Sequence, residues 1–267
     1  MPHQKINGTD IYFEDTGGSG PVLLFSHGLL WSSKMFAKQV GHFRSAYRVI
    51  TYDHRGQGRS AVPDGGYDMD TLTEDALALM DALGVDRFHF AGLSMGGFVG
   101  LRAALRAPER LRSLVLIETS AQPEPQENVP RYRMLNMMVR LMGVGAVKKP
   151  VMKIMFGQTF LQDPERKELR QEWKRELLNN KRTITRAVKG VIDREGIPPT
   201  DLARIECPTL IIVGEEDVAT VPEKSEYMQR HIPDAKLVRI PRAGHTSTVE
   251  EPAAVIEAME GFLAEVG

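Results

Sequence analysis

A serine that could act as a nucleophile lies at the centre of the stretch Gly92-Leu93-Ser94-Met95-Gly96. An alternating aromatic run precedes this stretch and a helix-like run follows it, so the sequence predicts a sharp strand-to-helix turn with Ser94 at its apex. The turn requires glycine two residues before and two residues after the serine, because larger side chains would collide at so tight a turn. The hydroxyl would emerge at the carboxyl end of the strand, next to the helix N-terminus and its positive dipole.

A glycine-rich turn that only packs a helix against a sheet would show the same pattern, so the function depends on what else the chain provides. A serine hydroxyl needs a base within hydrogen-bonding distance and a third group that orients the base. Among the seven histidines, His245 is the strongest candidate, because it follows the last predicted strand in a loop beside Gly244. His27 and His54 also follow predicted strands.

Asp217 is the candidate acid, because it lies just past the end of a predicted strand. Glu215 and Glu216 are rivals at the same turn, and a solvated loop carboxylate is the alternative interpretation of each. The serine, the acid and the histidine each follow a strand, and parallel strands bring their carboxyl ends to one edge of a sheet. We therefore expect Ser94, Asp217 and His245 to converge.

The elements that must position these residues alternate between strands and helices. Helical patterns occupy 71–84, which begins with capping-box spacing, and 252–262. The alternation predicts an α/β fold with a doubly wound, mostly parallel sheet. An Asn7-Gly8 dipeptide within 6–14 predicts a hairpin that forms an antiparallel edge. The predicted strands of the parallel part are 21–26, 47–52, 88–91, 111–117, 208–214 and 236–240.

Residues 122–200 break this alternation. The segment begins and ends with prolines and contains helical patterns rich in Met, Arg, Lys and Glu, without a strand-like run. We therefore predict a helical cap, 122–200, inserted into an α/β core that consists of residues 1–121 and 201–267. The cap methionines, which include Met138 and Met142, would either join the cap to the core or form an adaptable apolar wall above the active site.

With these features in place, the sequence resembles the α/β-hydrolase superfamily over most of the predicted core. The resemblance implies a serine hydrolase whose catalytic residues are Ser94, Asp217 and His245. It also implies that His27 and the loop 53–60 are scaffolding rather than reacting groups. The motifs that carry the resemblance occur in the family's order and are His27-Gly28-Leu29, the loop 53–60, the serine turn 92–97, the acid turn 214–217 and Gly244-His245.

The resemblance further implies an oxyanion hole formed by the backbone amides of Leu29 and Met95. The implied reaction is acyl transfer from an ester or lactone to Ser94, followed by hydrolysis. A serine nucleophile argues against the dehalogenases and epoxide hydrolases that share this scaffold. Within the superfamily the chain looks most like small bacterial esterases, 3-oxoadipate enol-lactonases and haloperoxidase-like perhydrolases. No metal and no organic cofactor is implied.

Three residues are candidates for the substrate pocket. Trp31 follows the oxyanion loop and could line the acyl pocket, although core packing explains it nearly as well. Met138 and Met142 could form the wall that the cap contributes. An enol-lactonase handles a carboxylate-bearing substrate, and cap cations such as Arg131 and Lys148 could hold one, although a solvated helix face explains those charges better.

Composition limits the expected partners and location. The chain has 267 residues, 42% of them hydrophobic, and a net charge of −1, which gives no basic field for nucleic acid and no polybasic membrane patch. No run of signal-peptide or membrane-spanning length occurs, so we expect a cytoplasmic protein. The expected partner is a small-molecule ester or lactone, and the oligomeric state is open.

A receptor that binds a small molecule without catalysis is the alternative from another functional class, because one fold can serve both purposes. An intact set of serine, base and acid favours the enzyme, since a receptor has no need to keep it. Covalent labelling of the serine distinguishes the two possibilities.

Overall fold

The central sheet has eight strands in the order β1-β2-β4-β3-β5-β6-β7-β8. The computed structural model describes residues 2–267. β1 and β2 form the antiparallel hairpin at one edge, and β3 to β8 are parallel, which confirms the predicted sheet. The strands are β1 His3–Ile6, β2 Thr9–Asp15, β3 Val22–Ser26, β4 Arg48–Tyr52, β5 Phe88–Leu93, β6 Leu111–Ile117, β7 Thr209–Gly214 and β8 Lys236–Ile240.

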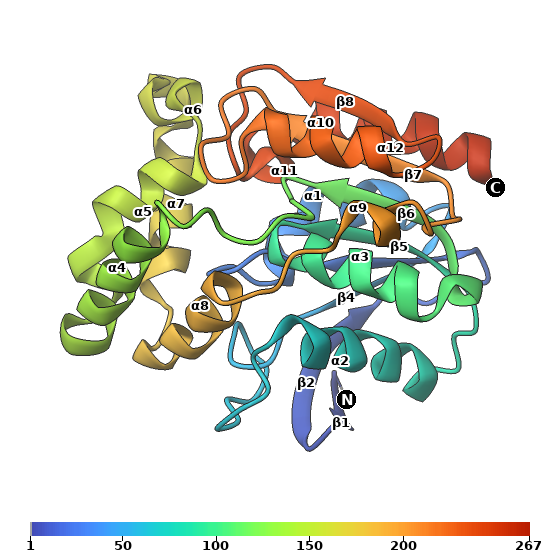
Figure 1. Cartoon of the computed structure of the whole chain (residues 1–267), viewed down its shortest axis with the longest axis horizontal. Coiled ribbons are helices and arrows are strands. Elements are labelled where there is room, and N and C mark those ends of the chain that lie inside the picture. The colour runs from blue at the N-terminus through green and yellow to red at the C-terminus, as the bar shows by residue number, and fades with distance from the viewer. Residues whose placement is uncertain (1) are drawn as a thin grey trace.

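Helices cover both faces of this sheet, which explains why β3, β5 and β7 are buried along their whole length and lack polar alternation. One face carries α2, α3, α9 and α10, and the other carries α1, α11 and α12 (Figure 1). The bounds are α1 Ala37–Phe43, α2 Met69–Ala82, α3 Met95–Arg106, α9 Pro199–Leu202, α10 Pro222–His231, α11 Ser247–Glu250 and α12 Pro252–Val266.

Helix α2 begins two residues before the capping box that the sequence suggested. Its N-cap is Asp68, whose side chain accepts a hydrogen bond from the Thr71 amide at 2.8 Å. The predicted cap at Thr71 is therefore wrong, because an aspartate one turn earlier satisfies the first free amides. The other end agrees with the prediction, since Gly84 follows the helix with a φ of +66°.

Between β6 and β7 the described chain forms helices and no strand. We call this helical layer, residues 122–200, the cap helices. They lie at the left of Figure 1, beside one end of the sheet. None of the helices within residues 2–267 combines the length and the hydropathy that crossing a membrane requires. The cap helices are α4 Val129–Met142, α5 Lys148–Met155, α6 Gln158–Gln162, α7 Lys167–Leu178 and α8 Thr185–Ile192.

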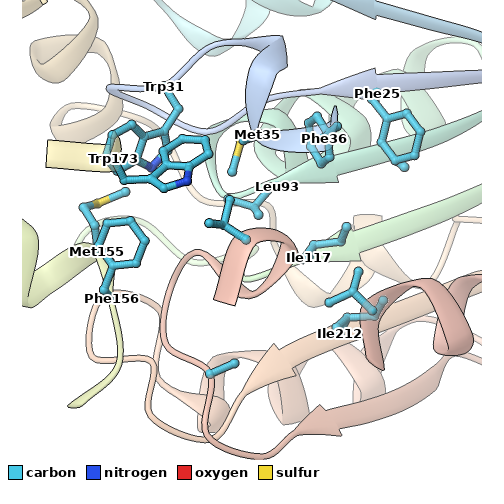
Figure 2. Packing of buried hydrophobic residues seen from close by; sticks show 14 of the residues in the cluster. Phe25, Trp31, Met35, Phe36, Leu93, Ile117, Met155, Phe156, Trp173 and Ile212 are labelled. Atoms are coloured by element: carbon cyan, nitrogen blue, oxygen red, sulfur yellow. The ribbon is translucent and has the colours of Figure 1, made fainter. Parts of the chain in front are cut away.

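A continuous apolar cluster joins the cap helices to the sheet. Figure 2 shows it running from Phe25 on β3 to Trp31 and across to Trp173 on α7. The rings of Trp31 and Trp173 meet edge to face with their centroids 5.1 Å apart. The loop after β3 is thus held between the sheet and the cap helices. Short 3-10 helices, η1 Ser33–Phe36, η2 Pro108–Arg110, η3 Val144–Val147, η4 Pro164–Arg166 and η5 Arg182–Ile184, complete the connections.

Candidate active site

Ser94 lies at the apex of the turn between β5 and α3. Its backbone has φ 52° and ψ −110°, a conformation that non-glycine residues rarely adopt. A Cβ atom on Gly92 would lie 2.3 Å from the Gly96 carbonyl oxygen, and one on Gly96 would lie 2.0 Å from the Ser26 carbonyl oxygen. The two glycines are therefore sterically required, as the sequence suggested, and the surrounding packing holds Ser94 in its strained conformation.

The structure brings Ser94, His245 and Asp217 together in one hydrogen-bonded chain. The distance from Ser94 Oγ to His245 Nε2 is 2.8 Å, and the distance from His245 Nδ1 to Asp217 Oδ2 is also 2.8 Å. The three residues are 7%, 3% and 2% exposed. Each follows a strand of the parallel sheet, β5, β8 and β7 respectively. The imidazole is thus placed to accept the serine proton while the carboxylate fixes the proton on Nδ1.

Asp217 is held as a charged acceptor. Its Oδ1 accepts hydrogen bonds from the amides of Ala219 and Thr220 at 2.7 and 3.0 Å, and its Oδ2 accepts one from the Thr220 hydroxyl at 2.6 Å. Burial alone would raise the pKa of Asp217, but the His245 charge and these hydrogen bonds lower the pKa to about 2. The carboxylate therefore stays ionised across the physiological range.

The neighbouring carboxylates, which the sequence left as rivals, have other positions. Glu215 is exposed. Glu216 accepts a hydrogen bond from the Thr159 amide at 2.8 Å and one from the Thr159 hydroxyl, so it ties the acid turn to the cap helices. Only Asp217 of this group contacts His245.

His27 and His54 are buried beneath the site. The His54 amide donates to Nε2 of His27 at 2.9 Å, and Nδ1 of His27 contacts the Gly28 carbonyl oxygen at 2.7 Å. Burial lowers the pKa of both histidines, and the nearby His27 lowers that of His54 further. Both imidazoles are therefore neutral and brace the loop after β3, in agreement with a scaffolding role.

Glu118, which the sequence analysis missed, is a second carboxyl group beside Asp217. It directly follows β6 with a φ of +47°, and both of its oxygens lie 2.9 Å from the Gly214 amide. Burial and then the negative charge of Asp217 raise the pKa of Glu118 well above its ordinary value. The raised pKa favours the protonated form of Glu118, which can donate a hydrogen bond to Asp217. Its position just past a strand, at the edge where Ser94 emerges, was a usable signal.

Glu250, also missed, holds the loop that carries His245. Its Oε2 accepts hydrogen bonds from the amides of Gly157 and Gly244 at 2.8 and 3.1 Å, and its Oε1 accepts one from the Thr246 amide at 3.0 Å. The side chain is almost fully buried, and burial raises its pKa to about 7. One carboxyl group therefore links both neighbours of His245 to the cap helices.

The backbone amides of Leu29 and Met95, the pair expected from the sequence, have no protein acceptor within residues 2–267. The adjacent Leu30 amide, by contrast, donates to Gln57 Oε1 at 2.8 Å, and the Leu30 carbonyl oxygen accepts from Asn180 Nδ2 at 2.8 Å. Leu30 has a φ of +73°. The two side chains fix this strained loop and leave the Leu29 amide available.

A cavity of about 140 Å³ opens above Ser94 and His245. Most of its wall is apolar and comes from the cap helices and the loop after β3. The polar residues of the wall, apart from those beside the serine, are Glu124, Tyr132, Asn136 and Arg194. The apolar wall consists of Leu29, Leu30, Phe98, Leu135, Val139, Val144, Val147, Val151, Ile154, Met155, Leu177, Ile184, Val188, Val191, Ile192 and Ala219.

None of the three residues predicted for the substrate pocket lines this cavity. Trp31 is 3% exposed and packs against Trp173, so it belongs to the core (Figure 2). Met138 is half-buried against the same core cluster, and Met142 is 58% exposed on the outer surface of α4. The structure thus places these three side chains in the core, against the core and on the surface, outside the wall of this cavity. Met155 is the cap methionine that does line it.

Within the described chain, no group of three or more His, Cys, Asp or Glu side chains is arranged to hold a metal ion. The chemistry that the site offers is that of a serine, a histidine and a carboxylate, with two free amides beside them. This arrangement matches the machinery of acyl transfer.

The sheet topology and the strained serine turn define an α/β hydrolase, and comparison with known proteins agrees. Residues 21–252 match the family model described as the alpha/beta hydrolase fold, so the chain belongs to the α/β-hydrolase family. It is therefore a hydrolase of that family.

Individual relatives differ in the reaction that their names describe. A 3-oxoadipate enol-lactonase from Acinetobacter baylyi is 30% identical over 244 residues, which cover 91% of this chain and 88% of that protein. RutD from Pseudomonas syringae, which is named as a carbamate hydrolase, is 30% identical over 250 residues. The match covers 91% of this chain and 93% of that protein. The structure of a thermophilic esterase from Thermogutta terrifontis matches with a TM-score of 0.88 and 31% sequence identity. The match covers 99% of this chain and 97% of the esterase.

Proposed function

We propose that the protein is a serine hydrolase that cleaves carboxylic esters or lactones through an acyl-enzyme on Ser94. The observation that carries this proposal is the hydrogen-bonded chain from Ser94 through His245 to Asp217 at the end of an apolar cavity. The esterase and enol-lactonase relatives support it. The partner is accordingly a small molecule with an activated carbonyl group.

In the first step, Ser94 Oγ attacks the carbonyl carbon of the substrate and its proton moves to His245 Nε2. Asp217 Oδ2 accepts the hydrogen bond from Nδ1, which selects the correct tautomer and stabilises the imidazolium. The carbonyl oxygen becomes negative and accepts hydrogen bonds from the amides of Leu29 and Met95. The tetrahedral species collapses when the C–O bond to the alcohol breaks and Nε2 returns the proton to the leaving oxygen.

The second step reverses these roles with water as the nucleophile. His245 Nε2 accepts a proton from water while the water oxygen attacks the acyl carbon. The same two amides hold the oxyanion, and the second collapse returns the proton to Ser94 and releases a carboxylic acid. A lactone follows the same route, except that the leaving oxygen stays attached to the acyl chain and the product is one hydroxy acid.

Labelling with a fluorophosphonate tests the proposal directly. Mass spectrometry should find a single adduct on Ser94, and Ser94→Ala should lose both the adduct and the turnover of p-nitrophenyl esters while its melting temperature is retained. A panel of p-nitrophenyl esters, lactones and a carbamate then ranks the substrate classes. Absence of both labelling and turnover in the intact protein would instead support a non-catalytic small-molecule receptor.

A further inference from the structure

A buried ion pair lies in the wall of the cavity above Ser94. Arg194 Nη1 is 3.1 Å from Glu124 Oε2, and the side chains of Arg194 and Glu124 are only 2% and 8% exposed. Both residues line the cavity together with Ser94 and His245. The remaining wall is apolar or neutral, so among residues 2–267 this pair supplies the permanent charges that a bound substrate would meet there.

The position of Arg194 is fixed from several sides. Its guanidinium carbon lies 4.2 Å above the ring of Phe98, which is one helical turn beyond Ser94 on α3. Nη1 also donates to the Val191 carbonyl oxygen at 2.7 Å, and Nη2 donates to the Gln122 carbonyl oxygen at 3.3 Å. Nε is buried and has no acceptor within residues 2–267. The guanidinium is therefore held in the wall of the cavity by one carboxylate, two carbonyl groups and an aromatic ring.

The charges around the pair provide no surplus of positive charge. Glu124 balances Arg194 directly. Lys224 lies close enough to Glu124, Arg194, Asp217 and Glu127 to feel them electrostatically, so three carboxylates face two cations. Burial lowers the pKa of Lys224, and Glu124 opposes that change. The pair itself therefore adds no net charge to the wall of the cavity.

From this arrangement we propose that the Glu124–Arg194 pair makes the cavity select uncharged substrates. This proposal rests on the proposed ester or lactone hydrolysis. Glu124 is the residue that excludes carboxylate-bearing substrates. A carboxylate that enters the cavity loses its water, and its attraction to Arg194 is cancelled by repulsion from Glu124. A neutral carbonyl or hydroxyl oxygen loses much less free energy on entry, because it carries no charge that must be desolvated.

The cap cations considered from the sequence do not change this balance. Arg131 is exposed, Lys148 is only half-buried, and neither lines the cavity. The one cation that faces the substrate space is Arg194, and it already has a carboxylate partner. The substrate class that fits is a neutral ester or lactone with an apolar chain.

Two esters of equal chain length test the proposal: p-nitrophenyl hexanoate and mono-p-nitrophenyl adipate, which adds a terminal carboxylate. The wild type should favour the neutral ester in kcat/KM by about 10²-fold, as expected for a charge that is desolvated without compensation. Glu124→Gln leaves Arg194 unpaired, so this preference should fall at least tenfold. Glu127→Gln, an exposed neighbour, is the matched control and should keep the wild-type preference.

The reciprocal variant keeps the test decisive if Glu124→Gln folds poorly. Arg194→Met leaves an unpaired carboxylate in the cavity, so it should discriminate further against the adipate ester and gain turnover of an ester with a terminal ammonium group. A wild type that already prefers the adipate ester would overturn the proposal. Unchanged charge preference in both variants, with turnover of the neutral ester retained, would overturn it as well.

A binding experiment separates this subsite from the catalytic proposal. Titration calorimetry on the Ser94→Ala protein compares hexanamide with adipamic acid, which carries the additional carboxylate. The Glu124→Gln change should reduce the affinity advantage of hexanamide over adipamic acid at least tenfold. If no ester is cleaved but this advantage falls, only the catalytic proposal fails. If esters are cleaved and the advantage is unchanged, only the subsite proposal fails.

Discussion

Replacing Glu250 by glutamine tests whether a buried carboxyl group controls the stability of the loop that carries His245. The wild-type side chain accepts three amide hydrogen bonds, from Gly157, Gly244 and Thr246. Glutamine has nearly the same shape but only one acceptor oxygen and no charge. The change therefore removes one hydrogen-bond acceptor, and it removes the titration of this site.

The magnitude follows from the pKa of Glu250, which burial raises from an ordinary value of 4.5 to about 7. At about 1.4 kcal/mol per pH unit, that difference corresponds to about 3 kcal/mol. The protonated form is favoured in the folded state, so its contribution is complete below pH 4.5 and is lost as the pH rises to about 7. The stability of the wild type relative to Glu250→Gln should therefore decrease by about 3 kcal/mol between pH 4 and pH 8.

Urea denaturation at several pH values measures this difference. Subtracting the unfolding free energy of Glu250→Gln from that of the wild type removes the contribution of Asp217, which both proteins share. Because the pKa of Asp217 is lowered, its contribution to stability is lost only in strong acid. The matched control is Glu257→Gln on the exposed side of α12, which should give a difference independent of pH. A wild-type advantage that stays constant or grows as the pH rises would refute the reasoning.

Two further predictions concern the acid and the core. Asp217→Asn should lower kcat for p-nitrophenyl esters by about 10²- to 10⁴-fold, because an amide no longer fixes the imidazole tautomer, whereas Glu215→Gln should leave kcat unchanged. Trp31→Ala should lower the free energy of unfolding in urea by about 3–5 kcal/mol, because the ring is buried against Trp173. Met142→Ala, at an exposed site, should change it by less than about 0.5 kcal/mol.

The parallel sheet and the convergence of Ser94, Asp217 and His245 could be predicted from the sequence because both depend on local signals. Continuous apolar runs mark strands that are covered on both faces. A residue just past such a strand must lie at the same sheet edge as its counterparts on neighbouring strands. No knowledge of side-chain packing was needed for either step.

The substrate pocket could not be predicted in this way, because α4 is apolar on more than one face. Leu135 and Val139 line the cavity, while Met134, Met137 and Met142 are exposed. A helical period indicates the inner face only when the opposite face is polar. The choice among these residues depends on how α4 lies over the sheet, and that placement is set by its packing against α8, η3 and η5.

Glu118 and Glu250 escaped detection because their partners are distant in sequence. Glu118 contacts the amide of Gly214, 96 positions away, and Glu250 contacts that of Gly157, 93 positions away. Neither carboxylate belongs to a motif with fixed spacing. Only the placement of Glu118 directly after a strand distinguishes it from the many solvated glutamates of the chain.

The two adjacent carboxyl groups at the site have pKa values shifted in opposite directions, and this difference assigns their roles. Asp217 accepts hydrogen bonds from His245 and Thr220 and its pKa is lowered, whereas burial and the charge of Asp217 raise the pKa of Glu118. Two neighbouring carboxylates cannot both carry a charge at low cost. Asp217 therefore provides the negative charge that the imidazolium of the proposed reaction requires, while Glu118 lies beside it and accepts the Gly214 amide.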